Sequence, residues 1–125
     1  MIKLYHYSHK DFSGYIRPDY FGENNYTKTS GKISGVKRNY FYLNKTGREY
    51  YFNGVKFLYI AEIKESQLYN LNKDKLKLAG RYNDIYKKIK KRGYKGLIGN
   101  NGYSCGVIFY PIKIKQRKKI GRAHV

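Results

Sequence analysis

Alternating apolar and polar residues mark the strands of this chain, because a half-buried strand has one apolar and one polar face. Residues 2–7 alternate in this way and predict a first strand, and residues 39–43 predict a second. Residues 55–63 form a longer β-rich run and predict a central strand. A short strand over residues 96–98 and a final strand over residues 106–114 follow, separated by Gly-Asn-Asn-Gly, a sequence typical of tight turns.

Two segments have helical patterns. Residues 72–79 predict a short helix that stops at Gly80. Residues 83–92 predict a better one, because Ile85 and Ile89 lie four positions apart and give it one apolar face. Strands combined with one or two short helices predict the α+β class.

The segments between these elements predict turns and loops. Residues 11–35 contain four glycines and a proline among polar residues, which is typical of a long functional loop with room for one helical turn. Residues 44–47, Asn-Lys-Thr-Gly, predict a turn after the second strand.

Size and composition indicate one small domain. A chain of 125 residues and 14.8 kDa holds a single hydrophobic core. Its 16 tyrosines suit half-buried strands and pocket walls. The single cysteine, Cys105, excludes an internal disulfide and a multi-cysteine zinc site. With no long apolar run and no signal-peptide pattern, we expect a cytoplasmic protein without a membrane partner.

The formal charge of +19 has two explanations that the sequence leaves open. One is a polyanionic partner such as nucleic acid. The other is codon usage: the amino acids whose codons are rich in A and T (Lys, Asn, Ile, Tyr and Phe) make up 64 residues, and lysine outnumbers arginine 20 to 7.

The last six residues, 120–125, read Ile-Gly-Arg-Ala-His-Val, which is what the start of a common short-read sequencing adapter encodes. We therefore expect a single domain over residues 1–119, followed by a tail that is adapter read-through. Without Arg122 the charge is +18, and His124 carries no functional weight.

Four segments carry motifs in a distinctive order along the chain. Residues 4–8 read Leu-Tyr-His-Tyr-Ser, in which a strand ends in a histidine followed closely by a serine. Next come Tyr-Phe-Gly at residues 20–22 and Gly-Val-Lys-Arg-Asn-Tyr-Phe-Tyr at residues 35–42.

The third segment is Leu-Tyr-Ile-Ala-Glu-Ile at residues 58–63, followed by Leu-Tyr-Asn-Leu at residues 68–71. The fourth combines Lys-Arg-Gly-Tyr-Lys-Gly-Leu-Ile at residues 91–98 with Val-Ile-Phe-Tyr-Pro at residues 107–111. In this order and spacing, the segments resemble the ADP-ribosyltransferase-like domains of phage polyvalent and MuF-type proteins.

The resemblance implies a small split β-sheet fold that holds NAD in a cleft between two small sheets. His6 would contact the nicotinamide ribose beside Ser8, and Tyr40 or Tyr42 would stack on the nicotinamide ring. Arg38 would form a bidentate contact with the pyrophosphate. The implied catalytic residues are His6, Tyr42 and Cys105, and the implied cofactor-binding residues are His6, Tyr7, Ser8, Gly22, Arg38, Tyr40 and Tyr42.

Many active members of the family have a glutamate just before the closing strand, and this chain has no acidic side chain in residues 99–125. Cys105 falls closest to that position, but a thiol with a pKa of roughly 8.5 is a poor substitute for a fixed carboxylate. Glu62, Glu65 and Asp84 are the other candidates for the missing charge.

Each candidate residue also has a structural interpretation. His6 fits a structural histidine on a strand, and Tyr40 and Tyr42 fit a stripe of core aromatics on one strand face. Cys105 fits a small buried residue. The basic run at residues 87–92 fits a solvated helix end as well as a phosphate contact.

Three functional hypotheses follow. The first is an NAD-binding ADP-ribosyltransferase, encoded by a phage or mobile element, that modifies a host protein or nucleic acid. The alternative is a catalytically inactive domain of the same fold that binds nucleic acid or a partner protein through a basic, tyrosine-rich surface. The third is a thiol-dependent enzyme in which Cys105 pairs with His6.

Overall fold

A computed structural model describes residues 1–18, 25–27, 31–33, 36–44, 56–78, 85–100 and 104–120. Most of the described chain forms one seven-stranded sheet in the order β11-β6-β1-β5-β9-β8-β7. Its strands are β1 (Ile2–Ser8), β5 (Asn39–Tyr42), β6 (Phe57–Ile63), β7 (Leu68–Asn70), β8 (Gly96–Asn100), β9 (Ser104–Ile108) and β11 (Gln116–Lys119). Neighbouring strands are antiparallel except β7 and β8, which run parallel.

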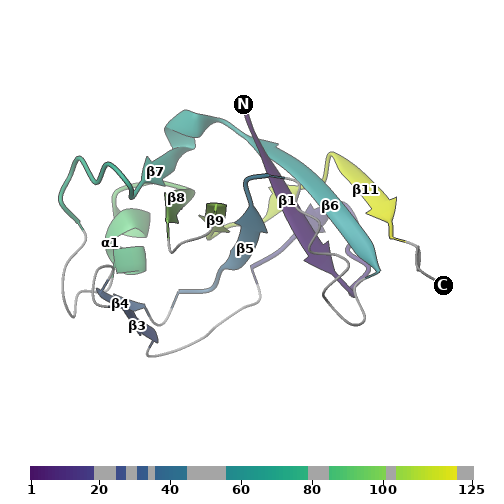
Figure 1. Ribbon diagram of the computed structural model, residues 1–125, viewed down its shortest axis with the longest axis horizontal. Helices are drawn as coiled ribbons and strands as arrows, with labels where there is room; N and C mark the ends of the chain where they lie inside the picture. The colour runs from purple at the N-terminus through teal and green to yellow at the C-terminus, as the bar shows by residue number, and fades with distance from the viewer. Residues whose placement is uncertain are drawn as a thin grey trace.

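Smaller elements surround this sheet (Figure 1). Two two-stranded ribbons pair β2 (Tyr15–Ile16) with β10 (Ile112–Lys113), and β3 (Asn25–Thr27) with β4 (Gly31–Ile33). A short 3-10 helix, η2 (Glu65–Gln67), leads into β7, and one α-helix is described, α1 (Ile85–Lys91).

The sheet has two halves that meet at a narrow joint. β1 pairs with β6 along its whole length, from Ile2 opposite Ile63 to Ser8 opposite Phe57. Between β1 and β5, in contrast, a single residue pair is in register, Tyr5 opposite Tyr42. Figure 1 shows the consequence: β1, β6 and β11 lie side by side at one end, and β7 and β8 lie near α1 at the other.

One face of the sheet packs against α1. The register aligns Tyr69, Leu97, Val107 and Tyr40 in a row across four strands. The helix covers this face with Ile85, Tyr86 and Ile89, all buried, as their helical spacing predicted.

The opposite face packs against the β2–β10 ribbon. Leu4, Phe41 and Tyr59 lie on this face, and Ile16 and Ile112 of the ribbon cover them. Gly106 of β9 belongs to the same layer, where an added Cβ would lie 3.2 Å from the Leu4 side chain and 3.4 Å from that of Leu43. The missing side chain therefore lets the side chains of Leu4 and Leu43 pack closely over β9.

The predicted class is confirmed at the level of mixed strands and helix. The strands predicted over residues 2–7, 39–43, 55–63 and 96–98 are present as β1, β5, β6 and β8. Within the described residues, no helix is long and apolar enough to cross a membrane.

The prediction of one final strand over residues 106–114 was wrong. β9 ends at Ile108, the chain bends through residues 109–111, and β10 then pairs with β2 instead of extending the main sheet. Pro111 lacks an N–H and cannot continue a ladder of hydrogen bonds. β11 and β7 were not predicted as strands.

The prediction of a helix over residues 72–79 was also wrong for its described part, residues 72–78, which form turns. Asp74 and Lys77 have φ angles of 42° and 51°, in the left-handed region that a helix excludes. The Asp74 carboxylate accepts hydrogen bonds from the Tyr69 hydroxyl and, at 2.8 Å, from the Leu78 N–H. Side chain to backbone bonding of this kind competes with a helix.

The other predicted helix, residues 83–92, is confirmed from Ile85 to Lys91, and residues 83 and 84 lie outside the described residues. The loop predicted over residues 11–35 contains β2, β3 and β4, and its Tyr-Phe-Gly motif lies outside the described residues. So do residues 45–47 of the predicted turn.

We predict that Asp74→Ala lowers the free energy of unfolding by about 1–3 kcal/mol, because two donors lose their acceptor. Urea denaturation followed by circular dichroism measures the change. Asp11→Ala is the control, because Asp11 pairs with Arg117 at the surface and its loss should cost less than about 1 kcal/mol. Equal losses in the two variants would contradict the role assigned to Asp74.

Candidate functional site

His6 lies at the joint between the two halves of the sheet. It sits near the end of β1 opposite Tyr59, on the face packed by the β2–β10 ribbon. Its ring lies 5.1 Å from the ring of Phe41 and 5.9 Å from that of Phe12. Its Nδ1 lies 2.8 Å from the carbonyl oxygen of Tyr40, across the line where β1 and β5 separate.

That hydrogen bond determines the roles of the two imidazole nitrogens. A carbonyl oxygen only accepts, so Nδ1 of His6 carries the proton and donates. In the neutral ring, Nε2 is then an acceptor. The bond thus fixes the orientation of the ring and makes Nε2 its acceptor atom.

Tyr7 and Tyr42 meet on the other face of the sheet. Their rings lie 5.8 Å apart at 61°, an edge-to-face contact. Tyr42 pairs with Tyr5, which neighbours His6 along β1 and therefore points to the opposite side. The structure brings His6 to the Tyr40 backbone and Tyr7 to Tyr42, but it places these two pairs on opposite faces.

Ser8 ends β1. Its hydroxyl oxygen accepts a hydrogen bond of 3.0 Å from the Lys10 N–H, which shapes the turn that follows the strand. This local bond holds the chain that carries Phe12 toward His6.

Arg38 is fully buried, with a relative exposure of 0%. Its Nε donates to the Tyr40 hydroxyl at 2.8 Å, and its Nη1 donates to the Val36 carbonyl at 2.8 Å. The guanidinium carbon lies 5.6 Å from the ring centroid of Tyr40 and 5.1 Å from that of Tyr86. In this arrangement Arg38 ties β5 to α1, and its guanidinium is shielded from solvent.

Cys105 occupies a backbone position in β9 opposite Tyr42 on one side and Gly99 on the other. By register, it belongs to the row that contains Tyr42, whereas His6 belongs to the row that contains Tyr59. The remaining sequence candidate, Gly22, lies outside the described residues.

Three of the four described carboxylates bond to partners other than His6. Asp11 pairs with Arg117, and Glu62 lies 3.8 Å from the Lys115 ammonium. Asp74 accepts from Tyr69, and Glu65 belongs to η2, next to β7. Of the three acidic candidates named from the sequence, Asp84 lies outside the described residues.

Sequence reasoning missed a pocket of about 480 Å³ at the β7 end of the sheet. Its walls include Leu68, Tyr69, Leu76 and Tyr94, and Lys73 and Lys75 lie at it as well. Burial raises the pKa of the Tyr69 hydroxyl, and the hydrogen bond to Asp74 raises it further, so Tyr69 stays a neutral donor. The only sequence signal was the short Leu-Tyr-Asn-Leu run, too brief to predict a strand.

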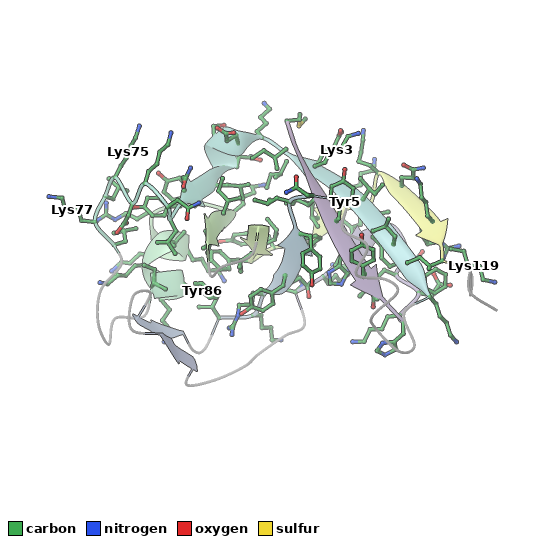
Figure 2. The ribbon with its side chains drawn as sticks, viewed as in Figure 1. Lys3, Tyr5, Lys75, Lys77, Tyr86 and Lys119 are labelled. Carbon is green, nitrogen blue, oxygen red and sulfur yellow. The ribbon has the colours of Figure 1, made fainter. Side chains whose placement is uncertain are left out.

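A second missed feature is the basic edge strand, which we define as the exposed residues of β10 and β11 together with the chain between them. Its cations are Lys113, Lys115, Arg117, Lys118 and Lys119, all exposed. Figure 2 shows Lys119 at one end of the molecule, whereas Lys75 and Lys77, in the turns that follow β7, lie at the other end.

We predict that Arg38→Lys lowers the free energy of unfolding by about 2 kcal/mol or more, because an ammonium cannot reproduce the two directed bonds and the stacking of a buried guanidinium. Arg17→Lys is the matched control, since Arg17 is exposed and lies over Tyr15, and should cost less than about 1 kcal/mol. Thermal and urea denaturation measure both. If Arg38→Lys were as stable as Arg17→Lys, the structural role would be wrong.

No protein-family model, no curated protein and no solved structure matches this chain. A functional proposal therefore rests on the residues of this chain and on their geometry.

Proposed function

We propose that this protein is an ADP-ribosyltransferase-like domain that binds NAD where β1 and β5 separate, with His6 as the contact to the nicotinamide ribose. The observation that carries the proposal is the 2.8 Å hydrogen bond from His6 Nδ1 to the Tyr40 carbonyl. It holds a strand histidine at the joint between two half-sheets, which is where the family resemblance locates the cofactor.

The chemistry of His6 suits a ribose. Since Nδ1 donates to Tyr40, Nε2 of the neutral ring can accept a hydrogen bond from a ribose hydroxyl. The rings of Phe41 and Phe12 flank the imidazole and limit its rotation. A ring held in one orientation binds with a smaller loss of side-chain entropy.

The tyrosines at the joint suit the nicotinamide. Its ring is cationic in NAD, and tyrosine faces attract cations. Tyr7, Tyr40 and Tyr42 are half-buried beside the joint on the face opposite to the His6 ring, so they would reach the nicotinamide only where β1 and β5 separate. Arg38, by contrast, supports Tyr40 from the interior, and we assign it to positioning that ring and not to the pyrophosphate.

The proposed reaction breaks the bond between the ribose C1′ and the nicotinamide nitrogen, and the bonding electrons leave with neutral nicotinamide. A nucleophile of the acceptor, a host protein or nucleic acid, then bonds to C1′ and releases its proton. His6 orients the ribose for this exchange. Stabilising the positive charge that develops on the ribose calls for a carboxylate.

We predict that His6→Ala weakens NAD binding about tenfold or more, because the ribose loses its acceptor. His6→Asn separates the two roles of the ring: its amide can still donate to the Tyr40 carbonyl, but it has no atom at the position of Nε2. Isothermal titration with NAD should therefore show weakened binding for both variants, while only His6→Ala also loses stability.

The control is His9→Ala, an exposed histidine three residues further along the chain, which should bind NAD like the wild type. Nicotinamide release, followed by chromatography, reports turnover in the same samples. Absence of NAD binding by the wild type at about 1 mM, or unchanged affinity in His6→Asn, would refute the cofactor claim.

A second candidate function, polyanion binding by a domain that does not catalyse, is favoured by the basic edge strand. Five exposed cations fall within seven residues of chain, and Asp11 and Glu62 pair with two of them. Arg117 lies 5.1 Å from the ring centroid of Phe57, so an aromatic ring accompanies the charge. Cations interleaved with aromatic rings are typical of single-strand binding surfaces.

For this candidate we predict that Arg117→Gln, Lys118→Gln and Lys119→Gln together flatten the salt dependence of binding to a single-stranded oligonucleotide. Each phosphate contact contributes roughly 0.7 to the slope of log affinity against log salt, so three contacts lower it by about 2. Fluorescence anisotropy measures the slope. The control replaces Lys77, Lys91 and Arg92 by Gln, an equal charge change at exposed positions elsewhere; an equal effect would exclude a defined surface on β11.

A further inference from the structure

We propose that the pocket beside β7 is a binding site for a nucleoside monophosphate, separate from the site proposed for NAD at His6. The pocket has a volume of about 480 Å³, which is large enough for such a ligand. Its walls combine rings and aliphatic side chains with cations and with one edge of the backbone of β7.

The backbone edge of β7 offers one acceptor and one donor. The Gln67 carbonyl and the Leu71 N–H bond to the β8 side, so the alternate residues Leu68 and Asn70 direct their backbone groups away from β8. The Leu68 N–H is bonded to the Glu65 carbonyl, and the Asn70 carbonyl to the Asp74 N–H. The Leu68 carbonyl and the Asn70 N–H remain, without a partner in the described part of the chain.

This pair matches the edge of a nucleobase. A carbonyl and an N–H two residues apart on the outer side of a strand lie side by side, one accepting and one donating. The edges of nucleobases present neighbouring donors and acceptors in the same way. A strand of added peptide fits less well, because β7 has only three residues, between η2 and the turns that begin at Leu71.

The side walls suit a flat aromatic ring. Tyr94 is half-buried at the pocket, and its ring lies 5.3 Å from that of Tyr69 at 64°, which fixes its orientation. Leu76 lines the pocket, and its apolar side chain is exposed, with 43% relative exposure. A base between Tyr94 and Leu76 would cover both.

The cations suit a phosphate. Lys73 and Lys75 are exposed and line the pocket, and Glu65 is the only acidic side chain among its described lining residues. Among the lining residues, the two ammonium groups therefore outnumber the one carboxylate. The loop that carries both lysines is held in place by the Asp74 carboxylate, which bonds to the Tyr69 hydroxyl and the Leu78 N–H.

Heteronuclear NMR titration with the four 5′-ribonucleoside monophosphates tests the proposal, since a 14.8 kDa chain gives resolved amide spectra. We expect saturable binding with a Kd below about 1 mM for at least one of them, with the Asn70 amide among the most shifted signals. The matching nucleoside, without phosphate, should bind more weakly. A nucleotide at the end of an oligonucleotide carries the same base and phosphate, so a short oligonucleotide is titrated as well. If it binds more tightly than the monophosphate, the ligand is the end of a nucleic-acid strand.

Lys73→Gln with Lys75→Gln should weaken the monophosphate about fivefold and leave the nucleoside unchanged, because only the phosphate contacts are lost. Lys77→Gln with Lys91→Gln is the control with equal charge loss outside the pocket. Leu76→Asp, a surface change, should weaken both ligands.

Shifts centred on His6 or β11, an equal effect of the control pair, or no saturation at about 5 mM would each overturn the proposal. His6→Ala should leave this titration unaffected. Failure of the NAD proposal and failure of this one are therefore separate results.

Discussion

The joint between β1 and β5 is the constraint on which the rest of the structure depends. One register pair, Tyr5 with Tyr42, connects the two half-sheets through the backbone. Side chains reinforce it from both faces: the His6 ring bonds to the Tyr40 carbonyl on one, and the Tyr7 ring packs against Tyr42 on the other. Because few ladder bonds are made here, these side-chain contacts add to the connection between the halves.

Much of the fold could be predicted from the sequence where apolar periodicity was strong. β1, β5 and β6 follow from alternation, and the spacing of Ile85 and Ile89 gave the helix face that covers the sheet. β11 carries no such signal, since Gln116–Lys119 has no apolar residue and is positioned by pairing with β6. A strand of that kind is determined by its neighbour and not by its own pattern.

The sequence pointed to His6 as a candidate but not to its contacts. The partner of its ring is a backbone carbonyl, which any residue at position 40 would supply. The resemblance implied a phosphate contact for Arg38, and arginine is rarely fully buried, so only the fold shows that its guanidinium lies between Tyr40 and Tyr86. Likewise, the sequence around Asp74 does not predict that its carboxylate bonds to the Tyr69 hydroxyl and that no helix forms there.

The two edges of the sheet solve the same problem in different ways, and this bears on the excess charge. An exposed edge strand invites pairing with other chains, and lysines on it prevent this. That need is enough to explain Lys118 and Lys119 on β11 without a polyanionic partner. The same need does not explain Arg117. Its guanidinium lies over Phe57 and pairs with Asp11, and these contacts orient the cation, which repelling another strand does not require. At β7 the edge is instead cut to three residues by the turns around it, which disfavours an added strand. In the described part of the chain this edge keeps one acceptor and one donor, enough to bond one edge of a nucleobase.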